Sequence, residues 1–337
     1  MSKSHLHAAE LPVSRRKFLL LGAAVASPMI ARSIAPAWSH DGFPARPIRL
    51  VIPWTAGSTA DLQMRSLSQL AQASLGQPVI IENRPGAGGT LHAVQLATGK
   101  PDGYTLGQMH LGMIRRPFML ASPQWDPVTS FTHILRLCGW RLGFAVKADS
   151  PWKTMAEFIQ TARDKPGQLT VANSGAASSP HIGMIELAEK AGIQINHVPF
   201  KSTAEGVNAV AGGHVDAVAG ESSIIPLVEG GQLRALSAWS RDRFVRLPDV
   251  PTLRELGYDM EVTTGFGISG PKGMPQPLVR LLHDAFKKAL FDPENKIVRD
   301  RFDMSEEYLD SDGYQAFIAE RAEYERQIVQ KYGLKAE

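Results

Sequence analysis

Two loops rich in glycine and serine hold the residue types that could bind an anion. The first spans residues 84–89 and the second spans residues 174–181. Each loop leads into a predicted helix, whose N-terminus presents unpaired amide N–H groups and about half a positive charge. Glycines let an anion approach the main chain, and serine hydroxyls add donors. The loops therefore predict a site for a carboxylate, although the glycines could equally form only a turn and a cap.

The second loop contains the clearer helix start. Pro180 suits the first helical position, and Ser178 or Ser179 suits the N-cap. We predict that one serine is the cap and that the other contacts the ligand together with backbone amides.

The same residues could instead be a nucleophile and a base. Ser178 and Ser179 precede His181 by three and two residues at a helix start, a spacing that does not establish the hydrogen-bonded geometry of a catalytic pair. The chain has no Gly-x-Ser-x-Gly elbow and no Gly-x-x-x-x-Gly-Lys-Ser/Thr run. The sequence therefore favours a binding protein over an enzyme.

Strands and helices alternate around the first loop. The apolar run Ile48–Ile52 predicts a strand, and the apolar spacing over residues 61–74 predicts a helix. A second strand over residues 79–81 precedes the loop at 84–89, and a third begins at Tyr104. Two consecutive strand–helix units indicate a parallel sheet.

A second series of the same kind begins near residue 143. The predicted strands are 143–146, 169–172, 197–199, 215–219 and 233–237, and the predicted helices are 154–164, 180–191 and 202–212. The first of these helices opens with a capping box, Thr154 to Glu157. From Phe266 the chain turns to Gly/Pro-rich segments, followed by predicted helices over 277–291 and 313–332.

The two series predict two α/β lobes, with the second inserted into the first. The first lobe comprises residues 43–142 and 266–337, and the second comprises residues 143–265. Ligands of open α/β sheets bind beyond the carboxyl ends of the strands, where both loops fall. We therefore expect a ligand cleft between the lobes.

The composition narrows the choice of partners. The chain of 337 residues is 44% hydrophobic and 20% charged, which is typical of globular domains. Its single cysteine, Cys138, excludes an intramolecular disulfide and a cysteine-based metal cluster, and is interpreted as a buried strand thiol. The net charge of +3 comes from the first 37 residues, which leave 31 basic against 32 acidic residues in the rest. Nucleic acid is therefore not an expected partner.

Residues 1–37 have the order of parts of a twin-arginine signal peptide. Arg15 and Arg16 precede the apolar run 20–31, and a small-x-small site ends at Ala37. The run is shorter than the ~20 residues of a membrane-spanning helix, and Arg32 interrupts its continuation. We expect export by the Tat machinery, cleavage after Ala37 and a periplasmic mature protein.

Six short segments follow one another in a specific order. They are Pro44–Val51, Pro53–Asp61, Val79–Gly89, Pro101–Leu106, His197–Lys201 and Leu247–Thr252. In this order they resemble the extracytoplasmic receptors of tripartite tricarboxylate transporters, the Bug family, and the resemblance covers residues 43–334. It implies a type II Venus-flytrap fold, with each lobe a mixed, mostly parallel sheet flanked by helices.

The resemblance also implies a function. A monomeric periplasmic receptor would trap a small organic acid, aromatic acids included, by hinge closure and deliver it to permease subunits in the membrane. It implies no catalysis, no cofactor and no metal. A receptor that reports to a membrane signalling partner would have the same features, and a periplasmic hydrolase is a more distant alternative.

The loop over residues 53–61 corresponds to the family loop that reaches over the ligand, and it departs from the family pattern. Trp54 stands where the family usually has Phe, and Ser58 replaces a second glycine. The indole could stack on an aromatic or bulkier acid, or could only pack beneath the loop. Asp61, in the first helical turn, is interpreted as a brace for the loop.

Four further residues have two interpretations each. His92 and His110 either line the cleft or are structural histidines. Lys201 either neutralises a ligand carboxylate or is solvated. Glu221 could accept hydrogen bonds from a ligand amine or hydroxyl, which would disfavour a polyanion such as citrate. The predicted ligand-contacting residues are Trp54, Thr55, Ala56, Gly57, Ser58, Gly86, Gly88, Gly89, His110, Ser174, Gly175, Ala177, Ser178, Ser179, His181, Phe200, Lys201 and Glu221.

Overall fold

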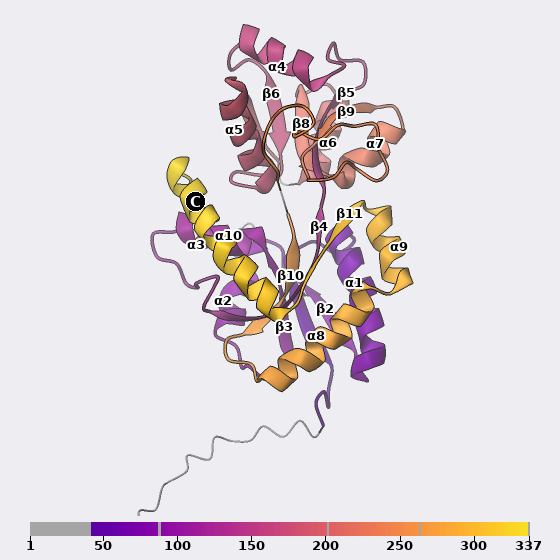
Figure 1. Ribbon diagram of the computed structural model, residues 1–337, viewed down its shortest axis with the longest axis vertical. Coiled ribbons are helices and arrows are strands. Elements are labelled where there is room, and N and C mark those ends of the chain that lie inside the picture. The colour runs from indigo at the N-terminus through magenta and orange to yellow at the C-terminus, as the bar shows by residue number, and fades with distance from the viewer. Residues whose placement is uncertain (1–41, 87–88, 201, 263, 336–337) are drawn as a thin grey trace, which may run out of the picture. The chain divides into compact units, whose positions relative to one another are not determined.

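The strands of the protein divide between two sheets, each covered by helices (Figure 1). The computed structural model describes residues 42–86, 89–200, 202–262 and 264–335. One sheet contains β1 (Ile48–Ile52), β2 (Val79–Asn83), β3 (Thr105–His110), β4 (Phe131–Trp140), β10 (Phe266–Pro271) and β11 (Met304–Leu309). The other contains β5 (Leu142–Lys147), β6 (Thr170–Asn173), β7 (Asn196–Pro199), β8 (Ala217–Glu221) and β9 (Leu233–Ala238).

Lobe I is built on the six-stranded sheet, whose strand order is β11-β4-β10-β3-β1-β2. β1 pairs in parallel with both β2 and β3, which confirms the two predicted strand–helix units. Its helices are α1 (Thr59–Leu75), α2 (Leu91–Ala97), α3 (Leu111–Met119), α8 (Gln276–Leu290), α9 (Pro293–Arg301) and α10 (Ser311–Lys331). α1 and α8 pack their apolar residues on one face of the sheet, and α2, α3 and α10 pack theirs on the other.

Lobe II is built on the five-stranded sheet, in the order β7-β6-β8-β5-β9. Its helices are α4 (Met155–Asp164), α5 (Ser179–Ala191), α6 (Thr203–Ala211) and α7 (Ile225–Glu229), with a 3₁₀ turn at Ser222–Ile224. Successive side chains of a strand point to opposite faces. In β5, Phe144 therefore joins the core beneath α4 and α5, while Ala145 joins the core beneath α6 and α7.

Both sheets are mixed, as expected, but the prediction that they are mostly parallel is wrong. β10 runs antiparallel to β3 and β4, and β5 runs antiparallel to β8 and β9. β4 leads directly into β5 of the other sheet, and β10 brings the chain back. A leaving strand and a returning strand therefore lie side by side in opposite directions.

Most predicted helices are present, with small shifts at their ends. Thr154 and Glu157 form both bonds of the capping box that begins α4. The predicted helices over 277–291 and 313–332 are α8 and α10, which begin one and two residues earlier. The predicted strand at 215–219 is β8, which begins only at Ala217.

The segment from Phe266, described from the sequence only as Gly/Pro-rich, forms β10, a central strand that was not predicted. A Cβ at Gly267 would collide with the carbonyl oxygen of Leu135 and lie 2.6 Å from the Tyr314 ring. Glycine is therefore needed for close strand packing here. Cys138, on the neighbouring β4, is a buried strand thiol as predicted.

The chain crosses between the two sheets after β4 and before β10, and one side chain joins these crossings. The Thr264 hydroxyl donates to the carbonyl oxygen of Trp140 at 2.7 Å and accepts from its amide at 3.1 Å. The pairing of β4 with β10, which ends with Phe266 opposite Cys138, is thereby extended toward lobe II.

Candidate functional site

The predicted ligand residues of lobe I lie at one edge of its sheet. β3, β1 and β2 are parallel neighbours, so their carboxyl ends meet at the same edge. The loop after β1 holds Trp54, Thr55, Ala56, Gly57 and Ser58, the loop after β2 holds Gly86 and Gly89, and His110 ends β3. The structure brings these residues to a common edge, whereas Gly88 lies outside the described residues.

Trp54 is half-buried at this edge and is held by its neighbours. Its Nε1 donates to Oε1 of Gln108 at 2.7 Å, and its ring centre lies 5.3 Å from that of His110 and 5.7 Å from that of Trp140. Trp54 therefore packs beneath the loop, which is one of the two roles that the sequence allowed for it. Contact of the indole with a ligand stays a prediction.

Asp61 braces the loop after β1, as predicted. Its buried carboxylate accepts from the Gly57 amide and from Asn83 Nδ2, each at 2.8 Å, and from Arg65 Nε at 2.9 Å. Burial opposes the charge, but the bonds from Arg65, Asn83 and Gly57 outweigh it and lower the pKa of Asp61. Ser58 is occupied too, because its hydroxyl accepts from the Asp61 amide as the N-cap of α1.

We predict that Asp61→Asn lowers the free energy of unfolding by about 1–3 kcal/mol, because hydrogen bonds to a charged acceptor are lost. The folded pKa is lowered, so the stabilisation is present above the unfolded pKa of about 3.9 and is lost as the pH falls through the folded value. Urea unfolding of both proteins from pH 7 to pH 3 measures this. A difference between them that grows on acidification would contradict the assignment.

The two histidines of this edge are structural. His110 Nδ1 accepts from the Gly112 amide at 3.1 Å, so its protonated Nε2 donates to the carbonyl oxygen of Gly89 at 3.0 Å. Burial lowers the pKa of His110 to about 4. His92 is buried beneath β3, and its Nε2 contacts the carbonyl oxygen of Gln108 at 3.0 Å. Both nitrogens of His110 are thus used within the protein, and it shapes the Gly89 loop.

The predicted ligand residues of lobe II also lie at one sheet edge. β6 pairs in parallel with β7 and β8, so the ends of these three strands meet. The loop after β6 holds Ser174, Gly175, Ala177 and Ser178 and leads to Ser179 and His181, Phe200 follows β7, and Glu221 ends β8. Lys201, predicted beside Phe200, lies outside the described residues.

The start of α5 assigns the two serines. Ser178 is the N-cap, because it is extended and its hydroxyl accepts from the His181 amide at 3.3 Å. Ser179 is the first helical residue. Pro180 is therefore the second helical residue, whereas it was predicted to be the first. The Ser179 hydroxyl has no hydrogen-bond partner in the part of the chain that the structure describes. Ser178 is therefore the predicted cap, and the ligand contact predicted for the other serine falls to Ser179 as a prediction.

The imidazole of His181 does not activate either serine. Its Nδ1 accepts from the Ala177 amide at 2.9 Å, and its ring packs edge-on against that of His197, with 4.6 Å between centres. Burial lowers the pKa of His181 to about 4, with smaller effects from the nearby His197 and Arg115. The bond between Ser178 and His181 involves the His181 main chain, so the pair lacks the geometry of a nucleophile and its base.

The turn before α5 has a left-handed residue that is not glycine. Ala177 has a φ of 57°, and its carbonyl oxygen accepts from Nη1 of Arg115 on α3 at 2.5 Å. This bond joins the carboxyl edge of one sheet to that of the other. Lobe I is thereby bonded directly to the turn that carries the predicted residues of lobe II.

Glu221 and Phe200 have partners within lobe II. Glu221 is half-buried, and its Oε2 accepts from the Thr203 hydroxyl at 2.8 Å. Burial raises the pKa of Glu221 and outweighs the opposing effect of Thr203. The Phe200 ring packs on the core beneath α6.

Three residues at these edges were not predicted. Gln108 and Asn173 are buried, and their side-chain amide nitrogens have no hydrogen-bond partner among the described residues. Asn173 Oδ1 accepts from the Gly175 amide at 3.0 Å. Gln108 and Asn173 could have been predicted from the sequence, because both lie at or near the end of a strand. Arg115 could not, because it follows an ordinary apolar turn of α3.

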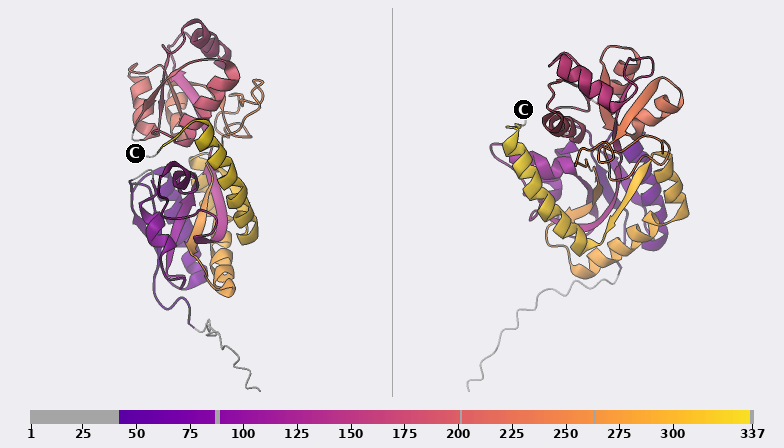
Figure 2. Two further views of the ribbon diagram at one scale, coloured as in Figure 1. Left: turned by 90° about the vertical axis from the view of Figure 1, so that its left-hand side faces the viewer. Right: turned by 45° about the horizontal axis from the view of Figure 1, so that its top comes forward.

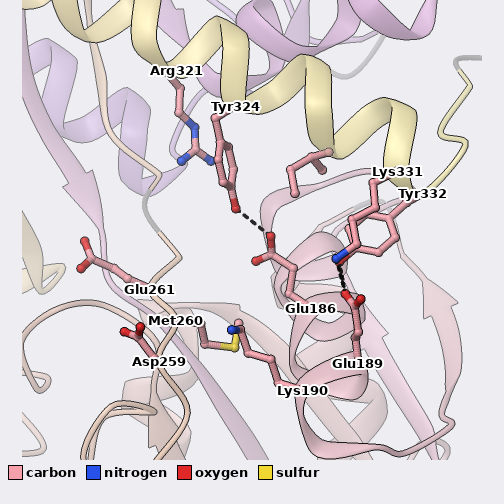
Figure 3. A pocket seen from close by; sticks show the side chains of 11 residues that line it. Glu186, Glu189, Lys190, Asp259, Met260, Glu261, Arg321, Tyr324, Lys331 and Tyr332 are labelled. Atoms are coloured by element: carbon pink, nitrogen blue, oxygen red, sulfur yellow. Dashed lines mark hydrogen bonds and ion pairs between the residues drawn. The ribbon is translucent and has the colours of Figure 1, made fainter.

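A cavity of about 700 Å³ lies elsewhere, between α5, α10 and residues 259–261 (Figure 3). Its described lining mixes acidic and basic side chains and includes none of the predicted ligand residues. In the described ranges, no helix is long and apolar enough to cross a membrane, and no group of three or more His, Cys, Asp or Glu side chains is placed to hold a metal ion.

Comparison with known proteins identifies the family. Residues 63–334 match the model of the tripartite tricarboxylate transporter family receptor. A UPF0065 protein from the gbd 5' region of Cupriavidus necator is 44% identical over 324 residues, which cover 96% of this chain and 99% of the relative. BugT of Bordetella pertussis is 30% identical over 266 residues, covering 76% and 80% of the two chains.

Solved structures agree with the sequence relatives. The periplasmic binding protein BugD is 28% identical, with a TM-score of 0.77 over 87% of this chain and 99% of its own. MatC from Rhodopseudomonas palustris, solved with bound malate, is 27% identical, with a TM-score of 0.73 over 85% of this chain and 100% of its own. These proteins share the two-lobed α/β fold and are binding proteins. The chain belongs to the family of tripartite tricarboxylate transporter receptors.

Proposed function

We propose that this protein is a periplasmic receptor that binds a small carboxylate between its two lobes and delivers it to a membrane permease. The observation that carries the proposal is the N-terminus of α5. It combines the Ser179 hydroxyl and main-chain amide, which have no hydrogen-bond partner among the described residues, with the dipole of a 13-residue helix. By comparison, α2 behind the Gly89 loop has only seven residues and makes a weaker anion site.

The family relationship supports a carboxylate as ligand. MatC, at 27% identity, was solved with malate. Glu221 at the edge of lobe II favours a ligand whose remote end carries a hydroxyl or ammonium donor, and it opposes a second carboxylate at that place. We therefore propose an organic acid with one principal carboxylate rather than a polyanion. One well-coordinated carboxylate and an apolar wall are compatible with a Kd near 1 μM, about −8 kcal/mol.

We propose that binding occurs by hinge closure of residues 43–142 with 266–337 against residues 143–265. The crossings after β4 and before β10 support this division. The strands between them, β5 to β9, form one sheet, and the strands before and after them form the other. Export through the twin-arginine route depends on residues 1–37, which lie outside the described residues. Fractionation of producing cells tests that part, since a cytoplasmic, uncleaved chain would contradict it.

A thermal-shift screen of residues 38–337 tests the binding function. The panel contains aliphatic, dicarboxylic, amino and aromatic acids, and a bound acid raises stability by RT ln(1 + [L]/Kd). A shift with one chemical class, without turnover of the compound, is the expected result. No shift with any acid would remove the carboxylate proposal, and turnover of a hit would support an enzyme instead.

We predict that Trp54→Phe changes ligand preference while the protein still folds. The smaller ring loses the bond to Gln108 and part of its stacking area, so affinity for aromatic acids falls by about 0.5–1.5 kcal/mol relative to aliphatic acids. Isothermal titration with both classes measures the ratio. Trp152→Phe, which loses an indole bond to Thr161 in lobe II, is the matched control. An unchanged ratio would remove Trp54 from the binding site.

A further inference from the structure

We infer that Arg115 is a positioning residue for this binding site, which fixes the turn before α5 and couples that turn to helix α10. The inference rests on the proposed function, because it concerns the same helix N-terminus. It adds a residue that no local pattern of the sequence indicates, and it assigns α10 a role in ligand binding.

The guanidinium of Arg115 is buried and makes bonds in two directions. Its side chain is 4% exposed. Nε and Nη2 donate to the two carboxylate oxygens of Glu325 on α10, at 2.5 and 3.1 Å, while Nη1 donates to the Ala177 carbonyl oxygen at 2.5 Å. The planar fork of arginine allows these three bonds at once, which the single ammonium of lysine cannot reproduce. The position of Ala177 is therefore set from lobe I.

Glu325 pairs with two arginines. Its carboxylate is completely buried and is shared between Arg115 and Arg321, whose Nε donates to it at 2.8 Å. Arg321 also lines the cavity that holds Glu186, Asp259 and Glu261, whereas Arg115 is the member of the cluster that bonds the turn.

The turn itself needs support from outside. Ala177 holds a left-handed φ of 57°, which costs a residue with a Cβ about 1 kcal/mol or more. Its amide donates to His181 and its carbonyl oxygen accepts from Arg115, so both sides of the residue are held. Ser178 and Ser179 follow at once, and a shift of Ala177 displaces the Ser179 hydroxyl and amide proposed to meet the carboxylate.

α10 also contacts α5 directly, farther along that helix. Tyr324 donates to Glu186 at 2.7 Å, and Lys331 and Tyr332 donate to Glu189 at 2.5 and 2.7 Å. Figure 3 shows these side chains of α10 facing α5 across the cavity, and Figure 2 shows the two helices close together from further directions. α10 thus holds α5 at its body directly and at its N-terminus through Arg115.

Arg115→Lys tests the inference, with Arg136→Lys as the matched control. Arg136 pairs with Glu307 and lies over the Phe317 ring of α10, but both partners are in lobe I. Kd is measured by titration with benzoate and with 4-hydroxybenzoate, which each carry one carboxylate, for the lysine variants alone and for Arg115→Lys combined with Ser179→Ala. Hydrogen exchange of residues 174–185 is measured in the ligand-free proteins, because that readout needs no ligand.

For Arg115→Lys we expect about a tenfold higher Kd and at least tenfold faster exchange in the turn and first turn of α5, with less than twofold changes for Arg136→Lys. The combination with Ser179→Ala should weaken binding by less than the product of the single effects, because Arg115 acts through the turn. Equal effects of the two lysine variants, or full additivity with Ser179→Ala, would overturn the inference. If the wild type binds neither acid, the proposed function fails for these ligands and the exchange comparison alone decides whether Arg115 holds the turn.

Discussion

Replacing Glu325 with glutamine is expected to lower the free energy of unfolding by about 3–5 kcal/mol. The carboxylate is fully buried and is the shared acceptor of Arg115 and Arg321. Glutamine keeps the shape but removes the charge, so the buried guanidinium of Arg115 loses its counter-charge. Urea unfolding followed by circular dichroism measures the loss.

Glu320→Gln is the control for this change, because Glu320 is exposed on the same helix. Its effect should stay within about 0.5 kcal/mol. A loss for Glu325→Gln as small as that of the control would mean that the buried cluster does not stabilise the fold.

The destabilisation by Glu325→Gln should depend on pH with a definite sign. Burial opposes the charge of Glu325, but Arg115 and Arg321 outweigh it and lower the pKa. The stabilisation from the charge is therefore complete above the unfolded pKa of about 4.3 and is lost as the pH falls through the folded value. Wild type and variant should converge in stability on acidification.

The second large effect concerns ligand binding. Ser179→Ala is expected to weaken carboxylate binding by about 1.5–3 kcal/mol, roughly 10- to 100-fold in Kd, because a hydroxyl donor to a charged acceptor is lost. Ser178→Ala should instead lower stability by about 0.5–2 kcal/mol through the lost cap, with a smaller effect on Kd. Isothermal titration and thermal unfolding of both variants separate these outcomes.

Thr154→Ala provides the reference for a lost cap, since Thr154 caps α4 away from both sheet edges. Its stability loss should match that of Ser178→Ala, without a change in Kd. If neither Ser178→Ala nor Ser179→Ala raises Kd tenfold, the carboxylate does not bind at this helix. If Ser178→Ala has the larger effect on Kd, the assignment of the two serines is reversed.

Local patterns predicted much of the fold because the forces involved are local. The apolar run at β1, the capping box of α4 and the loop before α5 each need only neighbouring residues to be recognised. The order in which strands pair depends on contacts across the chain. The central strand β10 was missed because Gly267, Gly270 and Pro271 are typical of loops, although the tertiary packing requires glycine there.

The candidate site divides in the same way. The loops at the strand ends were predicted, since glycine, serine and a following helix form a contiguous pattern. Arg115 and Glu325 are 210 residues apart, and only the folded chain places them together. His110 was a ligand candidate because it ends a strand. Its hydrogen bond to the Gly89 carbonyl oxygen and the one from the Gly112 amide could not be predicted from that position.

The bonds between Thr264 and Trp140 have a mechanical consequence for the proposed hinge closure. Two separate linkers would let the lobes twist and slide as well as approach. Because one hydroxyl fastens both crossings at the same level, they behave as a narrow two-stranded ribbon. A ribbon bends readily across its thin dimension and resists bending in its own plane. The lobes should therefore rotate about a single hinge axis, without sliding or twisting.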